Sequence, residues 1–187
     1  MFFIPGFLIA IVTFPGVIVH ELAHQFFCRL FKVPVLKVCY FRVGNPSGYV
    51  LHEPPSSGWV SLLISIGPFF VNSIVGPLVA LPAILSFKFA PPSPQGMELG
   101  MAFLNVFLAW LGVSIAMHAF PSTGDAKTMW KKMFEPGQSI ALKLVGVPLA
   151  AIIFIGAMGS IFWLDLIYGG AITLGLPQLL VHLIAST

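Results

Sequence analysis

Long apolar segments alternate with short polar connections along the whole chain. Each apolar segment is close to the roughly 20 residues that an α-helix needs to cross a bilayer. The pattern predicts five such helices, over Phe2–Phe31, Trp59–Phe87, Leu99–Phe120, Ile140–Leu164 and Leu166–Ala185. We therefore expect an all-α polytopic membrane protein with about five transmembrane helices.

Proline and glycine interrupt the first two apolar segments. Pro15 stands inside the first, and Gly67-Pro68 and Gly76-Pro77 stand inside the second. We expect a kink or break near Pro15 and a distorted second helix. Backbone groups freed at such breaks have to be satisfied by protein or water, so these breaks predict a cavity within the membrane region.

The connection after the first apolar segment has β character. Val35–Val43 alternates weakly, Gly44–Gly48 supplies turn residues, and Tyr49–Leu51 is rich in strand formers. This pattern predicts a short β-hairpin that dips toward the membrane, and its edge could accept an extended peptide by strand addition. An ordered loop without strands is the alternative.

Composition supports the membrane assignment. The chain is 58% hydrophobic and only 8% charged, whereas a soluble domain carries about 25% charged residues. We expect one membrane-embedded domain over residues 1–187, with a core at about 1–135 and two additional helices at about 140–187. The formal net charge of +3 arises from few charges. No basic stripe suggests a nucleic-acid partner.

Basic residues orient the chain in the bilayer. They concentrate in the connections after the first and third helices, at Arg29, Lys32, Lys37, Arg42, Lys127, Lys131, Lys132 and Lys143. The positive-inside rule then places the N-terminus outside and these two connections in the cytoplasm. Residues at the end of the first helix are expected toward the cytoplasmic side.

Three ionisable side chains stand inside the first apolar segment, where each is costly and usually functional. They belong to the sequence His20-Glu21-Leu22-Ala23-His24. Residues four apart share one helix face, so His20 and His24 can bind one metal ion from adjacent turns. Glu21 lies about 100° further round, which lets its carboxylate reach a metal-bound water. The motif predicts a zinc site with one ion per chain.

A catalytic zinc ion needs three protein ligands and one open position for water. Asp125, which follows the third apolar segment, is the first candidate for the third ligand, and His118 is its rival. A carboxylate would leave the site neutral with zinc and bound hydroxide, which suits a low-dielectric setting. Asp125 could instead be the N-cap of a short interfacial helix at Ala126–Phe134, and His118 a helix-end residue.

Together these elements resemble the site-2 protease family of intramembrane zinc metalloproteases. His20–His24 resembles the zinc motif of the family, and Gly67–Asn72 resembles its G-P-x-x-x-N element. Ala119–Pro121 followed by Asp125 resembles the segment with the aspartate ligand. Gly48–Val50 is similar to the membrane-associated β-loop.

The resemblance covers about Pro15–Lys127 and implies regulated intramembrane proteolysis of a transmembrane protein or peptide. It implies metal ligands at His20, His24 and Asp125, a base at Glu21, and substrate contacts at Asn72, Gly48 and Tyr49. Gly124 precedes Asp125, where the family has glycine after the aspartate, and His118 stands where the family often has proline. His118 therefore stays open as the third ligand.

Peptide hydrolysis by this motif requires water, a Lewis acid and a base. Zinc would polarise the scissile carbonyl, and Glu21 would take the proton of the attacking water. Asn72 would bind the substrate backbone or the oxyanion, with a purely interhelical hydrogen bond as the alternative. The competing functions are a metal-binding membrane protein, either a transporter or an inactive protease-like scaffold.

Overall fold

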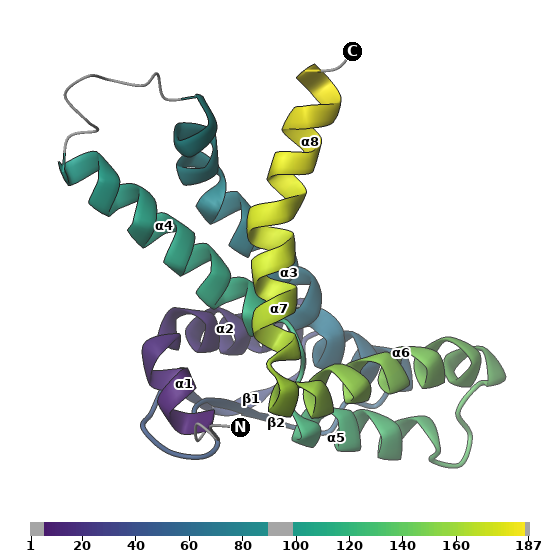
Figure 1. Cartoon of the computed structure of the whole chain (residues 1–187). Coiled ribbons are helices and arrows are strands. Elements are labelled where there is room, and N and C mark those ends of the chain that lie inside the picture. The colour runs from purple at the N-terminus through teal and green to yellow at the C-terminus, as the bar shows by residue number, and fades with distance from the viewer. Residues whose placement is uncertain (1–5, 90–98, 186–187) are drawn as a thin grey trace.

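The structure is a computed structural model that describes residues 6–89 and 99–185 (Figure 1). Helices dominate it, and the described strands form one two-stranded sheet. The elements are α1 (Gly6–Val12), α2 (Phe14–Leu30), β1 (Val35–Cys39), β2 (Tyr49–His52), α3 (Gly58–Phe89), α4 (Leu99–Met117), α5 (Thr123–Met133), α6 (Ile140–Gly159), α7 (Leu164–Gly170) and α8 (Leu176–Ala185). A 3₁₀ turn at Ser160–Phe162 precedes α7, and a π-helical segment at Ala171–Gly175 joins α7 to α8.

Within the described residues, α3, α4 and α6 are long and apolar enough to cross a membrane. Helices α1 and α2 would add a fourth span if the bent pair is counted as one. The expected five spans are therefore not confirmed. The segment expected as the fifth is α7, the π-helical segment and α8, and the first residues of the expected first span lie outside the described residues.

The break expected near Pro15 is present. Helices α1 and α2 meet at Thr13 and are bent by 92°. The Thr13 hydroxyl donates to the Ile9 carbonyl at 2.7 Å and closes the end of α1. Pro15 lies in the first turn of α2, where its missing N–H costs nothing.

Helix α3 runs through Pro68, Pro77 and Pro82 as one continuous element. Each proline removes the N–H that would bond to the carbonyl four residues earlier, so three carbonyls in α3 need other donors. One of these carbonyls, that of Ile64, lies 3.0 Å from His24 Nδ1 of α2.

The expected hairpin is confirmed. Strands β1 and β2 pair antiparallel, with Val38 opposite Val50 and Cys39 opposite Tyr49. The Tyr40 hydroxyl donates to the Gln25 side-chain oxygen at 2.6 Å and ties the hairpin to α2.

Helix α5 begins earlier than the sequence predicted, and Asp125 is not its N-cap. The N-cap is Ser122, whose backbone is extended and whose hydroxyl accepts from the Asp125 N–H. The Asp125 carboxylate in turn accepts from the Ser122 N–H at 3.0 Å, which completes a capping box. Two donors at the helix start are thereby satisfied, which fixes Asp125 in the first turn.

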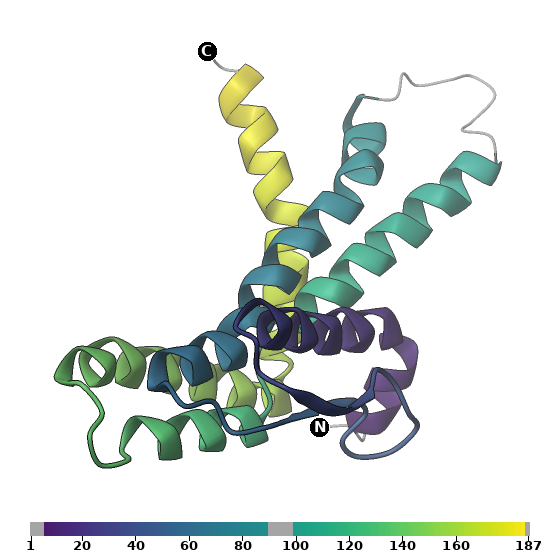
Figure 2. The same cartoon turned by 180° about the vertical axis from the view of Figure 1, so that it is seen from behind.

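The helices form two groups (Figures 1 and 2). Helices α4 and α8 and the C-terminal part of α3 extend to one end, whereas α2, the hairpin, α5 and α6 lie across the other. The two basic connections therefore share one end of the molecule. A buried core joins α3, α5 and α6 there, with Leu62, Ile66, Met129, Met133, Leu142 and Ile153 among its members.

Candidate metal centre

Helices α2 and α5 bring three possible metal ligands together. His20 and His24 on α2 are 8% and 6% exposed, and Asp125 in the first turn of α5 is partly buried. One ligand atom from each residue lies within 4.8 Å of the others. His24 Nε2 and Asp125 Oδ2 are 3.5 Å apart.

These separations suit a tetrahedral zinc ion. Zinc bonds of about 2.0–2.2 Å separate neighbouring ligand atoms by roughly 3.3–3.6 Å. The distance between His24 Nε2 and Asp125 Oδ2 has this length, and all three ligand atoms lie within 4.8 Å of one another. Two imidazoles and one carboxylate are also a donor set that leaves one position open for water.

The backbone fixes the tautomer of His20. Its Nδ1 lies 2.7 Å from the His118 carbonyl oxygen, just beyond the end of α4. A carbonyl only accepts, so Nδ1 carries the proton and Nε2 keeps the lone pair that a metal needs. Gly16, one turn before His20, permits this approach, because a Cβ there would lie 1.9 Å from the Ser114 carbonyl oxygen.

A proline fixes the tautomer of His24. Its Nδ1 donates to the Ile64 carbonyl oxygen of α3 at 3.0 Å. In a regular helix that carbonyl would accept from residue 68, but Pro68 has no N–H to give. The Gly67-Pro68 element thus frees the acceptor that orients His24 and leaves His24 Nε2 to face Asp125.

One carboxylate oxygen of Asp125, Oδ2, contacts the Ser122 N–H, the Ser122 hydroxyl and the His24 ring. Its Oδ2 accepts from the Ser122 hydroxyl at 2.6 Å and faces His24 Nε2 at 3.5 Å. Burial raises the pKa of the Asp125 carboxyl, but His24, His20 and the Ser122 hydrogen bond outweigh burial and hold this pKa below its usual value. Asp125 is therefore anionic at neutral pH, as a metal ligand has to be.

Glu21 is buried beside this group and lies against the hairpin. Its side chain is 7% exposed, and it does not belong to the three-residue ligand group. Gly48, which directly precedes β2, packs on it: a Cβ at Gly48 would lie 2.9 Å from Glu21 Oε1. Gly48 was expected to bind substrate, and it lies directly over Glu21, the expected general base.

Asn72 is fully buried between α2, α3 and α4. Its amide nitrogen donates to the carbonyls of Ile115 at 3.0 Å and His118 at 3.1 Å, with a longer contact to Gly16 at 3.4 Å. The His118 carbonyl is the one that accepts from His20. This placement favours the interhelical interpretation of Asn72 and makes the residue a support for the metal group.

The rings of His118 and Tyr49 point to local partners. His118 Nδ1 lies 3.0 Å from the Ser114 carbonyl of its own helix, and the ring is not in the three-residue group. The Tyr49 ring lies 5.3 Å from the Arg42 guanidinium carbon and 5.9 Å from Lys37 Nζ. The geometry thus favours Asp125 over His118 as the third ligand. His118 contributes through its backbone carbonyl, which accepts from His20.

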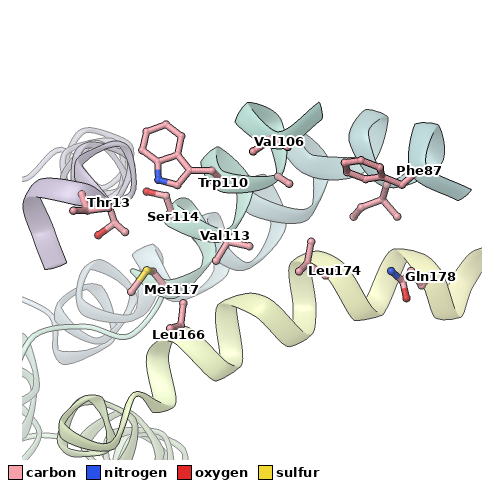
Figure 3. A pocket seen from close by; sticks show the side chains of 13 residues that line it. Thr13, Phe87, Val106, Trp110, Val113, Ser114, Met117, Leu166, Leu174 and Gln178 are labelled. Atoms are coloured by element: carbon pink, nitrogen blue, oxygen red, sulfur yellow. The ribbon is translucent and has the colours of Figure 1, made fainter. Parts of the chain in front are cut away.

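A cavity of about 440 Å³ opens beside the metal group. Its lining combines β2 residues with the start of α3 and the polar face of α5, including Val50, His52, Ser61, Asp125 and Lys132. A larger cavity of about 870 Å³ is apolar and lies between the α1–α2 junction, α4 and the α7–α8 run (Figure 3). None of the three candidate ligands lines the larger cavity.

Sequence reasoning missed the two backbone acceptors, Ile64 and His118, and the cap residue Ser122. A carbonyl has no sequence signature of its own, although Pro68 four residues after Ile64 was a readable signal for one of them. Comparisons of the chain with protein-family models, curated proteins and solved structures give no match.

Proposed function

We propose that the protein is an intramembrane zinc metalloprotease that hydrolyses peptide bonds in or near transmembrane segments of membrane-protein substrates. The observation that carries the proposal is the group of His20, His24 and Asp125, in which both imidazoles are oriented by backbone carbonyls. Such outer-shell hydrogen bonds are typical of metal-binding histidines. Glu21 is adjacent in sequence and outside the ligand group, as a general base should be.

The roles of the residues follow from this arrangement. His20, His24 and Asp125 would hold zinc, which when bound supplies a Lewis acid and lowers the pKa of water. Glu21 takes the proton of the attacking water at its carboxylate and passes it to the leaving amine nitrogen. Gly48 and the rest of the hairpin cover Glu21 and exclude bulk water from its carboxylate.

The edge of β2 is the proposed binding site for the substrate backbone. The Glu53 N–H donates to the Pro34 carbonyl at 3.0 Å, toward β1. By the alternation of an antiparallel pair, Val50 and His52 then direct their backbone groups away from β1. Both residues line the 440 Å³ cavity with Asp125. An unwound substrate segment that pairs here would recover the hydrogen bonds that its helix loses.

The membrane setting belongs to the same proposal. Three helices in the described part of the chain are apolar enough to span a bilayer, and the hairpin and α5 lie at one end of the molecule (Figure 2). Both connections at that end are basic, so we place this end and the active site toward the cytoplasmic side. Helix α1 lies at this same end (Figure 1), so its first residues would lie on the cytoplasmic side as well, whereas the sequence predicted an outside N-terminus.

Cleavage of a model transmembrane substrate by the purified protein tests the proposal, with Glu21→Gln as the matched control. The wild type should cleave and carry about one zinc ion per chain. Glu21→Gln should retain zinc and lose turnover, because it keeps the ligands and removes the base. His20→Ala and His24→Ala should lose zinc. Zinc retention without any cleavage by the wild type would instead favour metal binding or transport.

A further inference from the structure

Helix α5 presents a second face outside the three-residue metal group, and Lys131 at the edge of this face also lines the 440 Å³ cavity. Lys127, Trp130, Lys131 and Phe134 follow an i, i+3, i+4, i+7 pattern from α5 into its C-cap and therefore form one stripe. Trp130 is 48% exposed and Phe134 is 49% exposed, and both lysines are exposed. We call these four residues the outer stripe of α5. Alternating cations and aromatic rings are typical of helices that lie at a membrane surface.

The outer stripe borders an apolar groove between α5 and α6, which lie side by side (Figure 1). The groove has a volume of about 460 Å³. Ala150 and Ala151 of α6 line it with small side chains, and Trp130 and Phe154 line it with aromatic rings. Small side chains on α6 thus leave space for an elongated apolar group.

Positive charge surrounds this groove. Lys127 and Lys131 line it from α5, and Lys143 at the start of α6 lies 5.7 Å from the Phe134 ring. Among the described residues of α5, Lys132 is the lysine that forms an ion pair: its Nζ lies 2.6 Å from Glu135 Oε2, and both residues line the 440 Å³ cavity. An apolar groove with unneutralised cations complements a molecule with an acyl chain and an anionic headgroup.

We propose that the groove between α5 and α6 binds an anionic glycerophospholipid of the membrane. One acyl chain lies along Ala150 and Ala151 between the two aromatic rings, and the phosphate contacts Lys127 and Lys131. Helices α5 and α6 lie together across one end of the molecule, crosswise to α4 and α8 (Figure 1), which is the arrangement expected of helices at the level of the headgroups. This site is distinct from the metal centre and does not depend on proteolysis.

Trp130 provides a direct reporter of binding. A variant with Trp59→Phe, Trp110→Phe and Trp163→Phe retains Trp130 as its one tryptophan among the four of the chain. The full-length protein in detergent is titrated with phosphatidylglycerol or phosphatidylcholine whose acyl chains are brominated, and quenching of Trp130 is followed. We expect saturable quenching by phosphatidylglycerol at a concentration at least tenfold below that for phosphatidylcholine.

Two sets of variants separate the headgroup from the chain. Each lysine near an anionic headgroup is worth roughly fivefold in affinity, so Lys127→Gln with Lys131→Gln should weaken phosphatidylglycerol binding about 25-fold. Lys132→Gln, next to Lys131 but paired with Glu135, should change it less than threefold. Ala151→Phe should fill the groove and abolish quenching by both lipids without a change of charge.

Equal quenching by the two lipids, or quenching unaffected by the lysine pair, would overturn the proposal and indicate ordinary boundary lipid. Saturable phosphatidylglycerol binding that survives Ala151→Phe would overturn the assignment of the groove. Glu21→Gln should bind lipid as the wild type does, so failure of the protease proposal would leave this result intact. Circular dichroism of each variant verifies that a loss of quenching is not a loss of the fold.

Discussion

Gly48→Ala should reduce turnover without removing the metal. The new Cβ would lie 2.7 Å from Glu21 Cγ and 2.9 Å from Glu21 Oε1, whereas ordinary contacts begin at 3.4 Å. The Glu21 side chain would therefore have to retreat by about 0.5–0.7 Å. Gly48 is not among the glycines with positive φ, so alanine should fit its backbone without strain.

The magnitude follows from the displacement of the base. A misplacement of about 1 Å can cost on the order of 100-fold in rate, so we expect a loss of roughly 10- to 50-fold in kcat, or about 1.4–2.3 kcal/mol of barrier. Zinc content should stay at the wild-type level, because the three atoms nearest the new Cβ all belong to Glu21, which is not one of the candidate ligands.

The assay is the initial rate of cleavage of a model transmembrane substrate, with zinc measured on the same samples. Gly100→Ala is the matched control, since a Cβ there meets nothing within 4 Å. Glu21→Asp in the Gly48→Ala background should lose less than the product of the two single losses, because the shorter side chain leaves room for the methyl group. Turnover of Gly48→Ala within twofold of wild type would refute the reasoning that Gly48 positions the base.

Three further predictions address the ligands and the orientation. Asp125→Ala should lose zinc and cleavage in metal analysis and rate assays, whereas His118→Ala should retain most of both, because only the His118 carbonyl serves the site; the opposite result would assign the ligand to His118. Pro68→Ala should weaken zinc binding about tenfold in a chelator competition, because the restored N–H competes with His24 for its carbonyl acceptor; unchanged affinity would contradict this. In Pro136→Cys, the new thiol should react with an impermeant reagent added on the cytoplasmic side. Labelling by reagent added outside would contradict the proposed orientation.

The sequence predicted the parts of the fold that depend on local pattern. The break near Pro15 and the hairpin after α2 follow from proline, turn residues and alternation, and all are present. The predicted start of α5 was wrong by a few residues. Both Ser122 and Asp125 are residues typical of an N-cap, but Ser122 is the N-cap and Asp125 occupies the third helical position, where its carboxylate completes a capping box.

Long-range arrangement could be predicted only in part. Shared membrane depth brought Asp125 and the histidines of α2 into one hypothesis, and their side chains lie close together. Depth does not predict the direction of each apolar helix, and α6 lies across the direction of α8 (Figure 1). Main-chain acceptors escaped prediction, because their position depends on how the helices cross. The connection between α3 and α4, which the charge-derived orientation places on the outer side, lies beyond the described residues.

Helix α5 shows how one short element can serve three environments. Its 11 residues place Met129 and Met133 in the core, Asp125 beside His24, and Trp130 on the outside. The helical period keeps these faces apart, so each can change without a new backbone path. The core contacts fix the rotation of α5 about its axis, and the capping box fixes where its first turn begins. Once both are fixed, the position of Asp125 relative to α2 is determined, which explains how a partly exposed carboxylate can be held against two buried imidazoles.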